Sequence, residues 1–528
     1  MNATPDIFII YTDQQRWNTL FSPLVHTPNL DRLRDLGCTM ERAYSSSPVC
    51  MSARTDFLTG RSAKYHGYWI NANRPAACEL ETFPAMLGEC GYRTVAVGKM
   101  HHYPATEKRG WQEMYLMEEI PDSVEDDCYI QFLLKNNLDG VLSMHGVRSL
   151  LYHTPQKTPI PEKYHGTAWV TDKSIEILRQ EQAKPLCLMS SWIDPHPPWS
   201  IPASSLEKYK DAPLPETLPA PENSPYNPLR TEDLQKIKEA YYASCEFVDK
   251  HIGRLLEALD AAGKLKSSYI LFLSDHGEML GDRNMFQKFC AYDSSARIPM
   301  IAVGKGFEPG SISDIPVTNW DMTSTILDIA GVTESPTDLI GESLLAPMSE
   351  DRIICFHHGG DPIARNVGFE RYVAAVGLGF KYIHSYCGNG QDELYSLNND
   401  PNELNNLMNN ESCKAVISRL KQAAVNFELH HGQNYRIKDN DFINESSPAM
   451  LKNGFFGMRL EQLPGWKNIP DTKSEPIAEI IRALQENKII LPEDDSIPER
   501  VRKTLLDMEV DDDSVNLIMS ELATSISS

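Results

Sequence analysis

The sequence has few cysteines for its length and no long apolar run. Eleven cysteines are spread over 528 residues, and no CxxC pair occurs among them. This spacing excludes a disulfide-stapled scaffold and is typical of reduced, mostly buried thiols in a cytosolic protein. No apolar segment approaches the length of a membrane span. The N-terminal "MNATPDIFIIYTDQQ" lacks the basic and apolar regions of a signal peptide. We therefore expect a cytoplasmic protein with no membrane partner.

Basic residues are also in short supply. The chain has 50 Lys and Arg against 73 Asp and Glu, which gives a formal charge of −23. This balance argues against nucleic acid as a partner, because a phosphate backbone would be repelled. A small anionic substrate remains compatible, since a local cluster of cations and metal can reverse the field inside a site. The length predicts one large domain with smaller additions.

Short apolar runs alternate with helical patterns along the first half of the chain. The runs predict buried strands of the kind found in parallel sheets, at residues 5–12, 92–99, 185–192 and 268–275. Apolar residues at helical spacing predict helices at residues 28–37, 81–91, 170–182 and 231–263. This alternation predicts an α/β fold with a mainly parallel sheet.

The character of the chain changes near residue 350. Before this point, residues 212–228 are proline-dense and predict a loop. Residues 352–400 then contain short strand-like pieces with turn signals. Acidic helical segments follow at residues 475–488, 498–508 and 513–525. We expect a large domain at 1–350, a small-sheet α+β subdomain at 351–440 and a helical extension at 441–528. The extension is a candidate surface for homo-oligomer formation.

Polar residues with reactive or ligand-binding side chains follow each of the four apolar runs. They are Asp13, Gln14 and Gln15; Lys99, His101 and His102; Asp194 and His196; and Asp275, His276 and Glu278. Ligands of open parallel sheets bind outside the carboxyl ends of the strands. One such residue alone is more often a helix cap or a loop hydrogen bond. Four consecutive strand ends predict one rim that can hold a divalent metal and an anion.

The types of donor atom limit which metal ions the site is expected to bind. Asp13, Asp275 and His276 suit Ca²⁺, Mn²⁺ or Mg²⁺, whereas zinc sites more often show closely spaced His or Cys ligands. We interpret Lys99 as an anion contact and His196, in "PHPP", as an imidazole held by a stiff loop. The nearby tryptophans, Trp192 and Trp199, are expected in the core or in the wall of a cleft.

Seven pieces of the sequence, in order, are similar to a known family. They are "IFIIYTDQQR" (7–16), "CMSARTDFLTGR" (50–61), "GKMH" (98–101), "DPHPPW" (194–199), "YYASCEFVDKHIGRLLEAL" (241–259), "SDHGEMLGDRNMFQK" (274–288) and "ELYSLNNDPNELNNL" (393–407). The chain resembles the sulfatases of the alkaline phosphatase superfamily, and among them the branch of phosphonate monoester hydrolases and choline sulfatases. The resemblance covers roughly residues 5 to 430 and implies an alkaline phosphatase-like mixed sheet flanked by helices.

The resemblance implies roles for individual residues. Asp13, Asp275 and His276 correspond to metal ligands, with Ca²⁺ as the most expected ion. Gln14 stands where many sulfatases have a second metal-binding Asp, and it is either a weaker ligand or only a polar neighbour. Cys50 is at the position that the family converts to formylglycine, and Arg54 lies on its metal side. Lys99 and His101 neutralise the nucleophile and the sulfuryl oxygens. His196 and Lys288 face the leaving-group oxygen, and Asn71 contacts substrate oxygens.

These roles imply hydrolysis of a small anionic ester, namely a sulfated sugar or an aryl or alkyl sulfate, through a covalent intermediate on residue 50. The family's modification signal reads Cys-x-Pro-x-Arg, sometimes with Ala in place of Pro, whereas this chain has Ser52 at the third position. Three alternatives to sulfate-ester hydrolysis through formylglycine therefore stay open. The site can hydrolyse phosphonate monoesters or phosphodiesters, Cys50 can act as a thiol nucleophile, or the protein can bind anions without turnover.

Overall fold

The structure is a computed structural model of the whole chain. It describes residues 4–121, 123–138, 144–145, 155–158, 160–221, 231–359, 371–386, 392–443, 516, 519 and 520. The predicted helices at 475–488 and 498–508 lie outside the described residues. Of the segment 513–525, residues 516, 519 and 520 are described, and all three are helical. Among the described residues, none of the helices has the length and apolar character that a membrane span requires.

A central mixed sheet organises the large part of the molecule. Within the described residues its strand order is β11-β2-β10-β9-β1-β7-β4-β5. The strands are β1 (Ile7–Thr12), β2 (Cys38–Met40), β4 (Arg93–Gly98), β5 (Glu113–Leu116), β7 (Leu186–Ser191), β9 (Tyr269–Ser274), β10 (Met300–Val303) and β11 (Ser311–Ser313). The pairs from β9 to β5 are parallel, while β10 runs antiparallel to both of its neighbours. The predicted α/β fold with a mainly parallel sheet is confirmed.

Each face of this sheet supports a separate hydrophobic core. Side chains alternate between the faces of a strand, so Phe8 and Ile10 of β1 join one cluster while Ile7 and Ile9 join the other. The strand is therefore apolar throughout, as its sequence predicted, because helices cover both sides.

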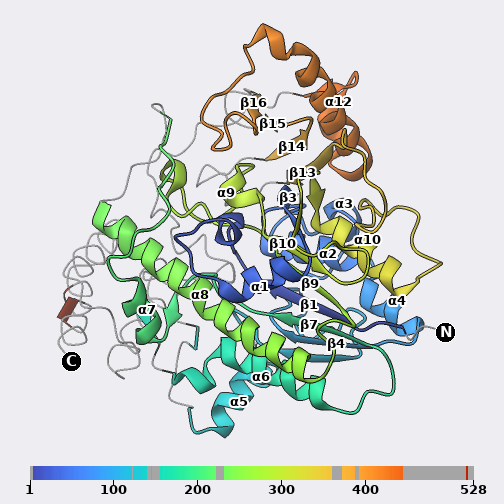
Figure 1. Cartoon of the computed structure of the whole chain (residues 1–528). Coiled ribbons are helices and arrows are strands. Elements are labelled where there is room, and N and C mark those ends of the chain that lie inside the picture. The colour runs from blue at the N-terminus through green and yellow to red at the C-terminus, as the bar shows by residue number, and fades with distance from the viewer. Residues whose placement is uncertain are drawn as a thin grey trace.

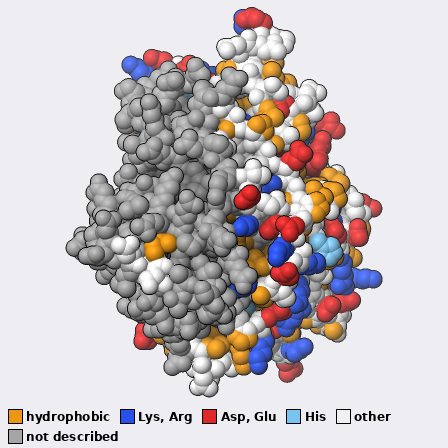
Figure 2. Space-filling model, turned by 90° about the vertical axis from the view of Figure 1, so that its left-hand side faces the viewer, with side chains coloured by type: hydrophobic (Ala, Val, Ile, Leu, Met, Phe, Trp, Pro, Cys, Tyr) orange, Lys and Arg blue, Asp and Glu red, His pale blue; other side chains and the backbone are white. Residues whose placement is uncertain are grey.

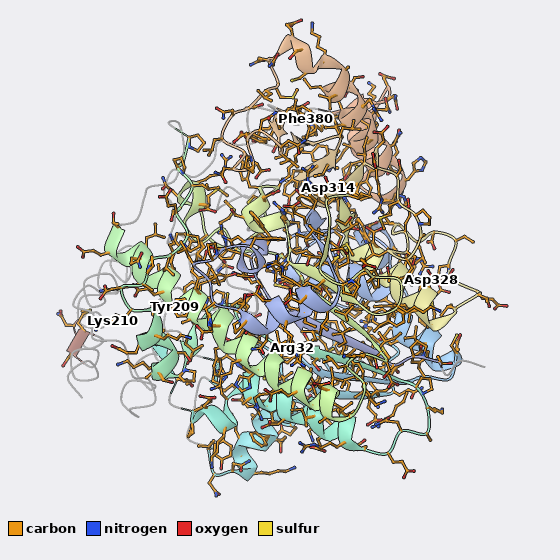
Figure 3. The ribbon with its side chains drawn as sticks, viewed as in Figure 1. Arg32, Tyr209, Lys210, Asp314, Asp328 and Phe380 are labelled. Atoms are coloured by element: carbon orange, nitrogen blue, oxygen red, sulfur yellow. The ribbon has the colours of Figure 1, made fainter. Side chains whose placement is uncertain are left out.

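The covering helices form a layer on each face (Figure 1). One layer contains α1 (Pro28–Leu36), α6 (Gly166–Arg179) and α8 (Thr231–Ala261). The other contains α2 (Cys50–Thr59), α4 (Phe83–Glu89) and α10 (Asn319–Ala330). All four predicted helices are present, although the segment predicted at 170–182 begins earlier and ends at Arg179. On the outside of the first layer, Arg32 of α1, labelled in Figure 3, forms an ion pair of 3.3 Å with Asp260 of α8.

A second sheet lies at the top of the view in Figure 1, beside the long helix α12 (Lys414–His431). It is antiparallel, with the strands β13 (Ile354–His358), β14 (Tyr372–Gly377), β15 (Phe380–Ser385) and β16 (Glu393–Ser396) in sequential order. Phe380, labelled in Figure 3, begins β15. The predicted small sheet of the C-terminal region is thus present, and its boundaries at 351 and 440 stay a prediction.

The remaining described elements are short. The helices are α3 (Ala63–His66), α5 (Cys128–Lys135), α7 (Ala203–Tyr209) and α9 (Asp293–Ala296). The strands form the pairs β3 (Ala43–Tyr44) with β12 (Val317–Thr318), β6 (Gln156–Lys157) with β8 (Ser200–Ile201), and β17 (Ile437–Lys438) with β18 (Asp441–Phe442). On the described part of the face in Figure 2, acidic and basic side chains are intermingled.

Gly98 is a position where the sheet requires glycine. Its φ is +99°, and a Cβ built there would lie 1.9 Å from the carbonyl oxygen of Ser191 on β7. We expect Gly98→Ala to be strongly destabilising. Gly91 is a matched control, because its φ is +89° and nothing lies within 4 Å of its Cβ position. Both variants carry backbone strain of about 1 kcal/mol, and the clash adds at least about 2 kcal/mol at residue 98. Thermal and denaturant unfolding measure both; equal losses would contradict the prediction.

Candidate active site

The carboxyl ends of four adjacent strands meet at one edge of the central sheet. The register pairs Thr12 with Ser274, Tyr11 with Ser191, and Gly98 with Ser191. Because the ends of β9, β1, β7 and β4 are level, the residues that follow them come together. The structure thus gathers the polar strand-end residues in the manner the sequence predicted.

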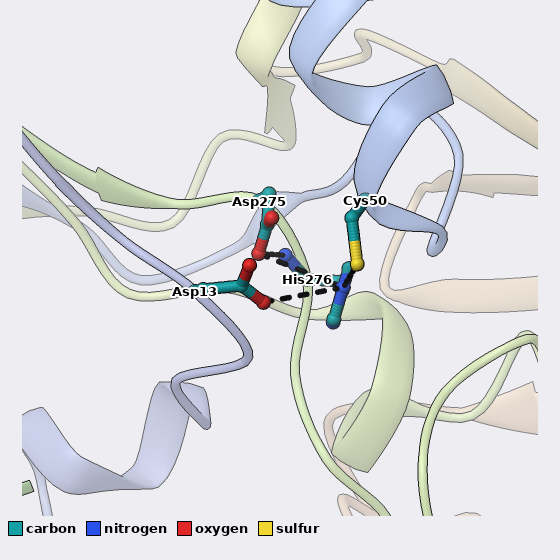
Figure 4. Close-up of side chains that lie close together, drawn as sticks. All are labelled: Asp13, Cys50, Asp275 and His276. Atoms are coloured by element: carbon teal, nitrogen blue, oxygen red, sulfur yellow. Dashed lines mark hydrogen bonds and ion pairs between the residues drawn. The ribbon is translucent and has the colours of Figure 1, made fainter. Parts of the chain in front are cut away.

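A compact donor cluster lies at this edge (Figure 4). One ligand atom from each of Asp13, Cys50, Asp275 and His276 lies within 4.8 Å of the others, and all four residues are buried. Asp13 follows β1, Asp275 and His276 follow β9, and Cys50 comes from the N-terminus of α2. The three predicted ligands and the predicted nucleophile precursor therefore share one place.

The donor set fits a divalent metal. Oδ1 of Asp13 is buried and has no hydrogen-bond partner in the described part of the chain. The imidazole of His276 has Nδ1 at 2.9 Å from the carbonyl oxygen of Gly277, which can only accept. Nδ1 therefore carries the proton, and the lone pair of Nε2 faces the cluster. A metal-bound histidine typically donates its other N–H to such an acceptor.

Two cations neutralise the carboxylates of the cluster. Arg54 donates from Nε to Oδ2 of Asp275 at 2.8 Å and from Nη2 to Oδ2 of Asp13 at 3.3 Å. Its Nη1 donates to the carbonyl oxygen of Lys99 and to Oγ of Ser191, both at 2.9 Å. The ammonium of Lys99 is paired with Asp13. These contacts occupy Oδ2 of both aspartates and leave Oδ1 of Asp13 toward the cluster.

Burial and neighbouring charges shift the pKa values of this site. Burial alone would raise the pKa of Asp275, but His276 and Arg54 lower it to about 2. Burial lowers the pKa of His276 to about 4. Burial, reinforced by Asp13, raises the pKa of the Cys50 thiol to about 12. Asp275 is thus held as a carboxylate and His276 as a neutral imidazole, the forms that bind metals.

The N-terminal turn of α2 fixes Cys50 and its surroundings. The helix starts at Cys50 after the extended residue Val49, and Sγ of Cys50 lies 3.1 Å from Nε2 of His276. Arg54 is one helical turn later, so it faces the same side. The hydroxyl of Ser52 points elsewhere and donates to the carbonyl oxygen of Tyr68 at 2.6 Å. Ser52, at the position where the resemblance expects Pro or Ala, thus contributes a hydrogen bond that anchors α2 to the chain at Tyr68.

Asn71 lies at the same helix end. Its Oδ1 accepts from the backbone N–H of Met51 at 3.0 Å, which satisfies one of the free donors of the first turn. The amide group of Asn71 is thereby held beside Cys50, where the resemblance placed a substrate contact.

Lys288, His196 and Gln14 form a second group beside the cluster. The ammonium of Lys288 donates to Oε1 of Gln14 at 2.7 Å and lies 3.0 Å from Nε2 of His196. Nδ1 of His196 lies 2.6 Å from the carbonyl oxygen of Pro197, so Nδ1 carries the proton and Nε2 accepts from Lys288. Lys288 has no local signal in the sequence and was expected here only from the family resemblance; the folding of the 278–297 segment over the sheet edge brings it beside His196.

His101 has a left-handed backbone, with a φ of +53°. Its backbone N–H donates to Oε1 of Glu118 at 2.9 Å. The buried Nδ1 of its imidazole has no hydrogen-bond partner among the described residues. Burial, with Lys99 nearby, lowers the pKa of His101 well below its usual value.

Sequence reasoning missed Glu118 and Glu119, which follow β5. Oε2 of Glu119 lies 2.5 Å from the ammonium of Lys99, and Oε1 lies 3.5 Å from Nδ1 of His196. The strand "EMYL" is short and not continuously apolar, so no strand was predicted there. The available signal was the pair of acidic residues after "YLM". The tryptophans Trp192 and Trp199 are completely buried in the hydrophobic clusters, and they are core residues.

A sequence model of the family described as Sulfatase matches residues 5–332, well over half of the chain. The chain belongs to the sulfatase family. A second model, described as the C-terminal part of N-sulphoglucosamine sulphohydrolase, matches residues 281–429 of this sulfatase. Family membership and the named relatives below support sulfuric ester hydrolase activity.

Relatives of this sulfatase include enzymes with named substrates. An arylsulfatase of Clostridium perfringens is 29% identical over 80% of this chain and 94% of its own length. A choline-sulfatase of Rhizobium meliloti is 27% identical over 77% of this chain and 83% of its own length. Among solved structures, the phosphonate monoester hydrolase of Silicibacter pomeroyi has a TM-score of 0.66 at 21% identity, covering 84% of this chain and 99% of that one. This last likeness confirms the alkaline phosphatase-like fold.

The donor cluster predicts stabilisation by a divalent metal. We expect Ca²⁺ or Mn²⁺ to raise the melting temperature of protein treated with a chelator, because binding at about 100 times Kd contributes about 2.7 kcal/mol. Asp13→Asn removes a buried carboxylate whose Oδ1 has no other partner, so it should abolish most of this shift. Differential scanning fluorimetry across a metal titration measures the effect.

Asp194→Asn is the matched control for this experiment. Asp194 is also buried beside the site, but its oxygens accept from the hydroxyls of Thr167 and Ser244. This variant should lose stability and keep the metal-dependent shift. A full shift in Asp13→Asn would rule out Asp13 as a ligand.

Proposed function

We propose that this sulfatase hydrolyses sulfate monoesters with a divalent metal, most suitably Ca²⁺, and with Cys50 converted to formylglycine. The observation that carries the proposal is the position of Cys50. Its side chain projects from a helix N-terminus into a cluster of metal-ligand atoms that lie within 4.8 Å of one another. An ordinary core cysteine has no reason to lie among two carboxylates and an imidazole.

In this proposal, a divalent metal and a hydrated formylglycine at residue 50 complete the site. Asp13, Asp275, His276 and Gln14 would hold the metal, which supplies positive charge where negative charge develops on the sulfuryl oxygens. Residue 50 as hydrated formylglycine would supply two hydroxyls on one carbon, one for attack on sulfur and one whose proton is lost when sulfate leaves. An unmodified thiol lacks this second hydroxyl. Arg54 would keep Asp13 and Asp275 ionised and fixed in orientation.

The substrate anion would be held by this chain's own donors. The Lys99 ammonium and the His101 imidazole lie on the β4 side, and Asn71 lies beside the first turn of α2. The positive end of the α2 dipole also faces the site, which favours a negative ligand. Together these groups would orient the ester and neutralise its oxygens.

The Lys288 and His196 pair would serve the leaving group. Lys288 already donates to His196 and Gln14 and has one further proton to offer. His196 accepts at Nε2, so Lys288 is the direct donor to the departing oxygen, and His196 keeps the ammonium in position. General-acid assistance of this kind matters most when the leaving alcohol is a poor one.

We propose a sulfated sugar or an aryl or alkyl sulfate, in line with the named activities of the relatives; one of them is an N-acetylglucosamine-6-O-sulfatase of Bacteroides thetaiotaomicron. Phosphonate monoesters are the second candidate, because the neutral amide of Gln14 takes a place where many sulfatases have another Asp. Localisation in the cytoplasm and self-association through residues 441–528 stay predictions.

The state of residue 50 tests the proposed function. Peptide mass spectrometry of the tryptic peptide 43–54 should show a residue lighter by the exchange of SH₂ for O, from a host that contains the modifying enzyme. Purified protein should then cleave aryl or sugar sulfates faster than phosphonate monoesters. Cys50→Ala should abolish turnover and keep the fold, as judged by circular dichroism.

A control separates the alternatives for Cys50. If the peptide carries only cysteine and the protein still cleaves sulfate esters, the thiol itself is the nucleophile. If it carries only cysteine and no ester in the panel is cleaved, the non-catalytic reading replaces the proposal. Activity retained by Cys50→Ala would exclude residue 50 as the nucleophile.

Lys288→Ala tests the leaving-group assignment. With an alkyl or sugar sulfate, we expect kcat to fall by about 10²- to 10⁴-fold. With 4-nitrophenyl sulfate, whose leaving group needs no proton, the fall should be much smaller. Steady-state kinetics on matched substrates measure the difference, and Lys250→Ala, on the exposed part of α8, is the control. An equal loss on both substrates would mean that Lys288 does not protonate the leaving group.

A further inference from the structure

Glu278 is a buried carboxylate to which the proposed function gives no role. Its side chain is completely buried. Oε1 accepts from the backbone N–H of Leu280 at 2.9 Å and from that of Gln287 at 2.6 Å. Oε2 accepts from Nε2 of Gln14. All three partners donate, so both oxygens of Glu278 act as acceptors, as those of a carboxylate do.

The backbone of Gln14 is fixed independently of this contact. Its N–H donates to Oδ1 of Asp275 at 3.0 Å, and its carbonyl oxygen accepts from the hydroxyl of Tyr241 at 2.8 Å. Its φ of +62° is in the left-handed region that residues other than glycine rarely adopt. Because the backbone is held in this way, what other contacts must still fix is the orientation of the side-chain carboxamide.

Glu278 decides that orientation. A carboxamide has a donating end and an accepting end, and a carboxylate can bind only the donating end. With Nε2 on Glu278, Oε1 must point the opposite way, where the Lys288 ammonium donates to it at 2.7 Å. The reversed carboxamide would place an NH₂ group against that ammonium and would present no oxygen to a metal.

The same carboxylate also holds the opposite wall of the site. Gln287, whose N–H it accepts, directly precedes Lys288. One buried side chain therefore sets the distance between the segment after β1 and the segment that carries Lys288.

We propose that Glu278 is a positioning residue that fixes the carboxamide of Gln14 with its oxygen toward Lys288. The consequence for metal binding rests on the proposed function, whereas the orientation itself rests on the hydrogen bonds alone. Glu278 touches neither substrate nor metal in this scheme and acts through Gln14 and the Lys288 segment.

Glu278→Gln and the exchange variant Gln14→Glu/Glu278→Gln test this role. The single variant keeps an acceptor for the N–H groups of Leu280 and Gln287 but presents NH₂ to the NH₂ of Gln14. We expect Ca²⁺ affinity to weaken about tenfold, kcat to fall, and the melting temperature without metal to drop by several degrees. The exchange variant restores one donor facing one acceptor, so it should recover the melting temperature and the affinity.

Calorimetric titration with Ca²⁺ and thermal unfolding in chelator give the two readouts. Glu428→Gln is the control, because Glu428 is an equally buried carboxylate that binds His357 in the C-terminal region. It should lose stability and keep wild-type Ca²⁺ affinity. Wild-type protein that binds no Ca²⁺ would count against the proposed function, whereas the unfolding comparison in chelator tests Glu278 alone.

Two results would overturn the role of Glu278. One is a Glu278→Gln protein with wild-type Ca²⁺ affinity, kcat and melting temperature. The other is an exchange variant no better than Glu278→Gln in melting temperature and affinity, because donor–acceptor polarity is then not the cause. If Glu278→Gln fails to fold, folding of the exchange variant supports the role, and failure of both overturns it.

Discussion

The site depends on keeping two aspartates ionised where water does not reach them. Asp13 and Asp275 are completely buried at adjacent strand ends, and two like charges in such surroundings are costly. Arg54 contacts both carboxylates, and Lys99 pairs with Asp13. Removing one partner from a buried charge cluster is strongly destabilising. The cations at this edge are therefore needed to maintain the fold even before they meet a substrate.

Local backbone geometry sets the directions in which the side chains of this site point. The first turn of α2 places Cys50 and Arg54 on one side of the helix, with Cys50 toward the donors and Arg54 toward the carboxylates. The left-handed conformations of Gln14 and His101 turn the chain sharply after β1 and β4. Such strained residues persist where surrounding contacts hold them, and here hydrogen bonds to Asp275 and Glu118 do so.

The C-terminal sheet contributes to the site through the segment that carries Lys288. Beyond Lys288, Asp293 is paired with the buried Lys381 of β15, and Lys381 also lies 2.5 Å from Oε1 of Glu403. Glu403 in turn accepts from the N–H of Asp293 at 2.7 Å. This buried ion cluster ties the segment to the second sheet at one end, while Glu278 ties it to Gln14 at the other.

The sequence alone determined the α/β fold, its four central strands and the rim residues Asp13, Lys99, His196 and Asp275, because a buried parallel strand leaves an apolar run that ends where the polar rim begins. Its motifs also determined the family. Only the tertiary structure decided the places of Lys288, Glu119 and Glu278. Lys288 and Glu119 follow no continuously apolar strand, and Glu278, although it stands in a rim motif, acquires its partners from distant parts of the chain. The family resemblance alone had predicted a role for Lys288. Local periodicity carries no information about which long-range contacts will satisfy a buried charge, so the partners of these three residues required the folded arrangement.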